Sequence, residues 1–168
     1  RIIRALIAAR TDPGEGGAVF YVMAAVDGFN PTVGLPAPVL DRPEIRHRMG
    51  LEMMDGLASL AAVDPVAVGL GDFGKLDGFL ERQVERWAKE LESYSRFEGW
   101  EGPGALGDVA MVGDWLSRYC PRTMKPGVIH GDYHIGNAIF SEDGALQAIV
   151  DWEMATLGDP LVDLGRIL

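Results

Sequence analysis

Residues 128–151 read VIHGDYHIGNAIFSEDGALQAIVD, and this stretch decides how the rest of the chain is interpreted. It contains two apolar, partly β-branched runs, Asn137 to Phe140 and Ala145 to Val150. The polar segment between them, Ser141-Glu142-Asp143-Gly144, has the composition of a tight turn. The stretch therefore predicts a β-hairpin, in which the chain runs out along one strand and returns along its neighbour.

The predicted hairpin brings oxygen-bearing side chains together. Asn137 begins the first strand and Asp151 follows the second, so the return of the chain places them side by side. Asp132 precedes Asn137 by five positions in a short loop. Carboxylate and amide oxygens suit a hard cation such as Mg²⁺, which keeps some waters and takes other ligands from phosphates. We predict a phosphoryl-transfer centre, with Asp132 as the base and Asn137 and Asp151 as metal ligands.

The order of these residues is that of a kinase catalytic loop, where an Asp base precedes a metal-binding Asn by five positions and a metal-binding Asp follows. Two departures from protein kinases are Gly131 between the His and the Asp, and Trp152-Glu153 after Asp151. Together with Gly158-Asp159-Pro160, the pattern HGDxxxxN followed by DWE resembles the aminoglycoside phosphotransferase and choline kinase family of small-molecule kinases. The resemblance looks closest to the branch fused to acyl-CoA dehydrogenases.

This resemblance implies an α+β fold of the protein-kinase type, present in part. Residues 1–27 would be the end of the small sheet lobe with its hinge, and residues 28–168 the first part of the helical lobe with the catalytic loop. The resemblance further implies ATP and Mg²⁺, and a small-molecule hydroxyl as the acceptor: an aminoglycoside, a choline-type alcohol or a hydroxyacyl compound. It makes Met23, Ala24, Ala25 and Val26 the hinge residues whose backbone groups pair with adenine.

Two other functions stay open from the residues alone. A non-catalytic nucleotide-binding or regulatory module of kinase descent would be free to lose one member of the Asp132, Asn137 and Asp151 set, and the intact set argues against it. A metal-dependent hydrolase usually recruits more His or carboxylate ligands than this stretch supplies. We expect His130 to be a buried histidine bonded to the loop backbone, and leave His134 unassigned.

The rest of the chain predicts a hairpin followed by helices. An apolar run to Thr11 and the β-rich run 18–26 flank a turn at residues 12–17. Four prolines between Pro31 and Pro43 indicate a loop without regular structure, with Asp41 capping the helix that follows. The expected helices cover residues 44–62, 77–93 and 106–119, each with an apolar stripe, and a last helix starts after Asp159.

The lysines of the chain are Lys75, Lys89 and Lys125, so none lies in the predicted N-terminal hairpin, where a kinase has its phosphate-pairing Lys. The glycines near residue 16 lack the frame of a phosphate-covering loop. We expect the small lobe to begin before Arg1 and the helical lobe to continue past Leu168. We also expect residues 1–168 alone to bind ATP weakly and to turn over little or nothing.

Composition narrows the class of protein. The chain has 168 residues, 48% of them hydrophobic, which is enough for one globular domain. A net charge of −10 argues against a nucleic-acid partner, because phosphate backbones are bound by clustered Lys and Arg. The lone Cys120 allows no internal disulfide. No apolar run approaches the roughly 18 residues that span a bilayer, and we expect a soluble cytoplasmic protein without a membrane partner. The oligomeric state stays open.

Overall fold

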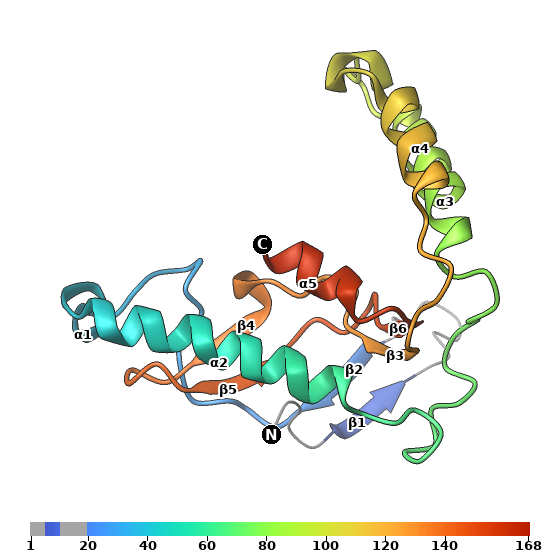
Figure 1. Ribbon diagram of the computed structural model, residues 1–168. Coiled ribbons are helices and arrows are strands. Elements are labelled where there is room, and N and C mark those ends of the chain that lie inside the picture. Colours follow the sequence, from blue (N-terminus) through green and yellow to red (C-terminus); the bar gives the residue numbers. More distant parts are fainter. Residues whose placement is uncertain (1–5, 11–19) are drawn as a thin grey trace.

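The computed structural model describes residues 6–10 and 20–168, and it combines helices with short antiparallel strands (Figure 1). This mixture confirms the predicted α+β class. In chain order the strands and α-helices are β1 (Leu6–Arg10), β2 (Phe20–Met23), α1 (Ala37–Asp41), α2 (Pro43–Ala61), α3 (Glu81–Ser93), α4 (Val109–Arg118), β3 (Gly127–Ile129), β4 (Ala138–Phe140), β5 (Leu146–Ile149), β6 (Thr156–Gly158) and α5 (Leu161–Ile167). Single 3₁₀ turns cover Tyr94–Arg96, Pro103–Leu106 and Ile135–Asn137.

The strands form three two-stranded antiparallel sheets: β1 with β2, β3 with β6, and β4 with β5. The β4–β5 pair is the hairpin predicted from residues 137–150. The β1–β2 pair agrees with the predicted N-terminal hairpin, whose turn at residues 12–17 lies outside the described residues. The β3–β6 pair joins segments almost thirty positions apart, with Val128 opposite Leu157. The β3–β6 and β4–β5 pairs therefore lie on either side of the loop that contains Asp132.

Helix α2 supplies the main core and lies along the β4–β5 hairpin (Figure 1). Its buried apolar side chains recur every three or four residues, as the sequence predicted, and are Ile45, Met49, Met53, Leu57 and Leu60. The first four belong to one buried cluster with Tyr133, Phe140 and Ile149, which are at most 1% exposed, and Leu60 belongs to a second cluster with Val128 and Leu157. Each such side chain contributes about 1.5–3 kcal/mol when buried. The buried face of α2 thus packs beneath the loop that contains Asp132 and beneath the β4–β5 hairpin.

Four predictions about the helices are wrong. The Pro-rich stretch contains α1, because Pro38 sits in the first turn of that helix, where a missing N–H costs nothing. Asp41 ends α1 and does not cap α2, whose first flanking residue is Arg42. Helix α3 begins at Glu81 rather than Asp77, and α4 begins at Val109, after Asp108 accepts a hydrogen bond from the Met111 N–H at 2.8 Å.

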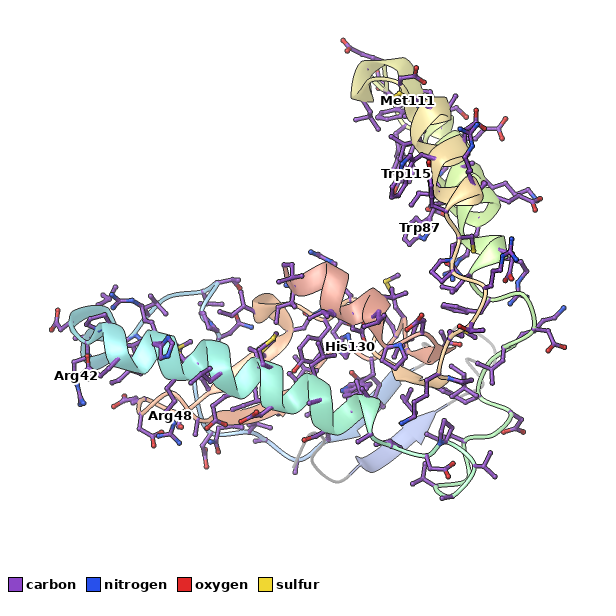
Figure 2. All side chains as sticks on the ribbon, in the orientation of Figure 1. Arg42, Arg48, Trp87, Met111, Trp115 and His130 are labelled. Carbon is purple, nitrogen blue, oxygen red and sulfur yellow. The ribbon has the colours of Figure 1, made fainter. Side chains whose placement is uncertain are left out.

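Helices α3 and α4 form an arm that extends away from α2 and the sheets (Figure 1). Neither helix buries a residue, although both carry the predicted apolar stripes. Trp87 and Trp115, on the arm in Figure 2, are 53% and 58% exposed. Their stripes border an apolar hollow of about 520 Å³ that the half-buried Cys120 also lines. Among the described residues, no helix combines the length and apolar character needed to cross a membrane.

Candidate active site

The β4–β5 hairpin places Asp151 beside Asn137 on the backbone. The Val150 N–H donates to the Asn137 carbonyl oxygen at 2.9 Å, one pair beyond the register of Ala138 with Ile149. The turn closes through the Gly144 N–H, which donates to Ser141 O at 2.8 Å, and Gly144 has a φ of 87°. Asp151 therefore directly follows the residue that pairs with Asn137, as the sequence predicted.

Asp151 has an unusual backbone conformation. Its φ is 67°, and within the described part of the chain it is the one residue other than glycine with a positive φ. Such a conformation costs about 1–3 kcal/mol and persists where the surrounding structure fixes it, often at functional sites. Trp152 fixes it on one side, because its indole N–H donates to Ile149 O at 2.9 Å. The Asp151 side chain lies exposed at the end of the hairpin.

The carboxylate of Asp132 accepts hydrogen bonds from three side chains. Arg166 Nε donates to Oδ1 at 2.9 Å. His134 Nε2 and Asn137 Nδ2 lie 3.2 and 3.1 Å from Oδ2. Asn137 Nδ2 also lies 3.0 Å from the Asp132 carbonyl oxygen, so the amide links both ends of the loop. The structure thus brings Asp132 and Asn137 into direct contact, and Asp132 is left 31% exposed.

These contacts hold Asp132 in its ionised form. Partial burial raises the pKa of its carboxyl group, but the hydrogen bonds from Arg166 and His134 and the positive charge of Arg166 outweigh it and lower the pKa below its ordinary value. A carboxylate that is ionised and partly exposed can accept a hydrogen bond from an incoming hydroxyl group.

The two loop histidines have separate roles. His130 is fully buried; its Nε2 lies 2.9 Å from Val150 O, and its Nδ1 accepts the Asp132 N–H at 3.3 Å. This confirms the prediction of a histidine bonded to the loop backbone. His134 Nδ1 accepts the Gly136 N–H at 3.0 Å, which leaves the proton on Nε2 for donation to Asp132. His134, which the sequence left unassigned, therefore orients Asp132.

Asp163 of α5 holds the backbone of the loop that contains Asp132 through hydrogen bonds. Its carboxylate accepts the N–H groups of His130 at 2.7 Å and Gly131 at 2.9 Å, and the residue is 1% exposed. Gly131 has a φ of 87°, and a Cβ atom there would lie 2.6 Å from Met154 O. Glycine is therefore required where protein kinases have Arg. Asp159 supports the start of α5, since its Oδ1 accepts the Leu161 N–H at 3.0 Å.

The predicted metal ligands, Asn137 and Asp151, supply few oxygen atoms to a metal ion in the absence of a nucleotide. Within the described residues, no cluster of three or more His, Cys, Asp or Glu side chains is arranged to hold a metal. Asn137 Nδ2 is engaged by Asp132, which leaves Oδ1 as its acceptor, and Asp151 adds an exposed carboxylate. A donor set of two side chains fits Mg²⁺, which takes its remaining ligands from water and phosphates.

The predicted hinge residues lead into this site. β2 ends at Met23, and Ala24 to Val26 continue without regular structure. The chain then pairs Phe29 with Phe140 of β4 through two hydrogen bonds of 2.8 and 2.9 Å. The segment at residues 23–26 thus joins the β1–β2 sheet to the hairpin that carries Asn137 and Asp151.

Two residues that contribute to the site were not predicted from the sequence. Arg166 reaches Asp132 from α5, and Asn30 Nδ2 donates to Gly136 O at 2.5 Å. Both act across more than thirty positions, and neither belongs to a local motif. The charge of Arg166 in the last turn of α5 is an ordinary helix feature and carried no signal of a contact with the loop.

Comparison with known proteins gives one consistent result. The profile of the phosphotransferase enzyme family matches residues 3–168. A probable acyl-CoA dehydrogenase of Arabidopsis thaliana is 33% identical over 92% of this chain and 19% of its own length. Acyl-CoA dehydrogenase family member 10 of Mus musculus is 30% identical over 88% of this chain. The chain spans less than a fifth of these curated relatives' own length.

Solved structures share the fold. A Ralstonia eutropha protein with a provisional assignment as an aminoglycoside phosphotransferase is 30% identical, with a TM-score of 0.77 over 99% of this chain and 49% of its own. A phosphotransferase solved with GDP and kanamycin has a TM-score of 0.59 at 18% identity, over 95% of this chain and 52% of its own. The predicted kinase-like fold is confirmed, and the chain corresponds to about half of such a domain.

Proposed function

Because the chain belongs to the phosphotransferase enzyme family, we propose that the complete protein transfers the γ-phosphoryl group of ATP to a hydroxyl group of a small molecule. One observation carries the proposal: the Asp132 carboxylate lies 3.1 Å from the Asn137 amide, and the Asn137 backbone pairs with Val150, the residue directly before Asp151. This is the set of groups that phosphoryl transfer requires, namely one to orient the nucleophile and two to hold a cation at the phosphates.

In this proposal Asp132 accepts the hydroxyl proton of the acceptor and directs its oxygen at the γ-phosphorus. The transition state is loose, so most of the rate enhancement comes from positioning and charge rather than from a strong base. A carboxylate with a lowered pKa suits this task, because it stays ionised and oriented while the hydroxyl proton leaves late.

Asn137 and Asp151 are the proposed metal ligands. Mg²⁺ bound there would neutralise charge on the β- and γ-phosphates of the nucleotide. Asp151 has a left-handed backbone conformation at the end of the hairpin, and the hydrogen bond from Asn137 to Asp132 couples one proposed metal ligand to the proposed base.

The backbone of Met23, Ala24, Ala25 and Val26 is the proposed partner of the adenine edge. The segment that follows β2 has no regular structure from Ala24 to Val26, and its backbone N–H and C=O groups would pair with a planar base. The relative solved with GDP accepts a guanine nucleotide, so ATP and GTP should both be assayed here.

For the acceptor we favour a hydroxyacyl compound over an aminoglycoside or a choline-type alcohol. The support is that the curated relatives are acyl-CoA dehydrogenases that contain a segment like this chain. A kinase joined to such an enzyme would act on a related acyl chain.

The test is phosphate transfer by the full-length protein. It would be incubated with Mg²⁺, labelled ATP or GTP, and one acceptor of each of the three classes, and phosphomonoester formation would be followed by ³¹P NMR. We expect transfer to one class, abolished in Asp132→Asn and retained in the exposed control Asp55→Asn. Phosphate release without transfer to any acceptor would indicate a hydrolase, and nucleotide binding without turnover would indicate a regulatory module. Either result would overturn the proposal.

A further inference from the structure

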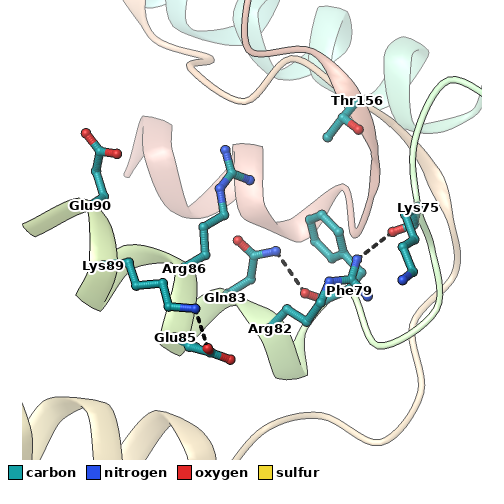
Figure 3. Close-up of a pocket in the computed structure, with 9 residues that line it drawn as sticks. All are labelled: Lys75, Phe79, Arg82, Gln83, Glu85, Arg86, Lys89, Glu90 and Thr156. Atoms are coloured by element: carbon teal, nitrogen blue, oxygen red, sulfur yellow. Dashed lines mark hydrogen bonds and ion pairs between the residues drawn. The ribbon is translucent and has the colours of Figure 1, made fainter. Parts of the chain in front are cut away.

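A second hollow, of about 470 Å³, lies between α3 and the start of β6 (Figure 3), and Asp132 is not among the residues that line it. Its wall on the α3 side carries four cationic side chains, Lys75, Arg82, Arg86 and Lys89. Thr156 of β6 stands on the opposite side. Four cations around one hollow are unexpected in a chain with a net charge of −10.

The positive charge of this hollow is only partly neutralised. Lys89 Nζ pairs with Glu85 Oε1 at 2.6 Å, and these two side chains turn toward each other in Figure 3. Arg86 and Glu90 extend from the other side of α3. No ion pair of the described residues includes Lys75, Arg82 or Arg86. Glu90 is therefore the one carboxylate lining the hollow that is left to face three cations.

The hollow has a fixed floor. Phe79 is 6% exposed and packs so closely on β6 that a Cβ atom at Gly158 would lie 2.4 Å from its ring. Gln83 Nε2 donates to Phe79 O at 2.8 Å, and Arg82 Nη2 donates to Lys75 O at 2.8 Å. Phe79 thus anchors the base of α3 to β6, and Arg82 is held at the rim with several N–H donors unused.

We propose that this hollow is a subsite for a phosphate group of a second small molecule, separate from the nucleotide. Guanidinium groups present planar pairs of N–H donors that match phosphate oxygens, and Lys adds a mobile charge. Thr156 closes the opposite side of the hollow. The inference rests on the proposed function in one respect, that the nucleotide phosphates lie at Asn137 and Asp151.

The subsite is within reach of the reacting groups. Thr156 is the register partner of Ile129, and Cα atoms of such partners lie about 5 Å apart. Three residues of chain span at most about 11 Å, so the Cα of Asp132 lies within about 16 Å of that of Thr156. An extended acceptor that carries a phosphate group could occupy both places, and so could a free phosphate-bearing effector beside a smaller acceptor.

The test uses inorganic pyrophosphate as the probe and titration calorimetry on the full-length protein saturated with Mg²⁺ and a non-hydrolysable ATP analogue. We expect pyrophosphate to bind, and the double variant Arg82→Gln/Arg86→Gln to weaken it at least about tenfold. The double control Arg96→Gln/Arg118→Gln removes the same charge from exposed arm positions outside the hollow and should leave affinity unchanged. Circular dichroism would verify that both variants fold.

Three results would overturn the inference: absence of pyrophosphate binding, equal weakening in the two double variants, or complete displacement of pyrophosphate by the ATP analogue. If the analogue itself fails to bind, the proposed function fails, while selective loss in Arg82→Gln/Arg86→Gln would still support the subsite. Steady-state kinetics would show whether the bound phosphate group belongs to the acceptor or to a free effector. A phosphate on the acceptor predicts a raised KM for that acceptor in the variant, whereas a free effector predicts an unchanged KM and a lost response to pyrophosphate.

Discussion

Arg166 Nε donates to Asp132 Oδ1 at 2.9 Å, joining the last turn of α5 to the loop that contains the proposed base across 34 positions. The same helix holds the loop backbone through Asp163, which accepts the N–H groups of His130 and Gly131. One short helix therefore fixes both the position of the proposed base and its charge state. The site depends on α5 as much as on the hairpin that carries the proposed metal ligands.

Replacing Arg166 should change the pH dependence of the reaction. Arg166 lowers the pKa of Asp132, so its removal in Arg166→Met should raise that pKa. Because the base works in its ionised form, we expect the acid limb of the kcat profile to move to higher pH. Arg166→Lys should restore part of the shift, and Arg118→Met on α4 should leave the profile unchanged. An acid limb that stays in place in Arg166→Met would show that the contact has no electrostatic role.

The same contact predicts a stability effect with a defined sign. The folded-state pKa of Asp132 lies below its ordinary value of 3.8. The stabilisation it provides is therefore fully present above pH 3.8 and is lost as the pH falls below that value. Urea unfolding of the wild type and Arg166→Met should converge at low pH and differ near neutrality. A constant difference across the range would contradict this assignment.

Asp163→Asn should loosen the loop. The amide keeps the shape of the side chain but has one oxygen, so one of the two N–H groups of His130 and Gly131 loses its acceptor in a buried site. We expect the free energy of unfolding to fall by about 1–3 kcal/mol, measured by urea denaturation, together with reduced kcat. Asp55→Asn on the exposed face of α2 is the control and should change neither quantity.

Two glycines of α2 give a matched pair. A Cβ atom at Gly56 would lie 2.7 Å from the Tyr133 hydroxyl, which donates to Met53 O at 2.8 Å, and 2.9 Å from Leu146 Cδ2. Gly56→Ala should therefore destabilise the fold by about 1–3 kcal/mol. Gly50 has nothing within 4 Å of the same position, so Gly50→Ala should stabilise the helix by about 0.5–1 kcal/mol. Equal shifts in thermal midpoint for the two variants would show that the packing beneath Tyr133 is not as described.

Local features of the chain were predictable because their causes are local. The β4–β5 hairpin follows from two apolar runs and the turn at residues 141–144, and the adjacency of Asn137 and Asp151 follows from the hairpin. Helix α2 follows from apolar residues at spacings of three and four. Helix α1 does not follow from the local pattern, because four prolines in this stretch indicate a loop, although Pro38 lies where a helix tolerates it.

Long-range features could not be predicted from local patterns. β3 and β6 have three residues each, too few to show a period, and they form only because they pair with each other. The contact of Arg166 with Asp132 depends on that pairing, since β6 leads into α5. The apolar stripes of α3 and α4 were predicted correctly as patterns, but within the described part of the chain they face an open hollow rather than a core.

The central claim is tested most directly by measuring kcat of Asp132→Asn together with the affinity of the same sample for the Mg²⁺–nucleotide complex. Asp132 is proposed to act on the acceptor and Asp151 on the metal, so Asp132→Asn should lose at least about a hundredfold in kcat while nucleotide affinity changes little. Asp151→Asn, measured in parallel, should lose Mg²⁺-dependent nucleotide binding. Wild-type turnover in Asp132→Asn would contradict the account.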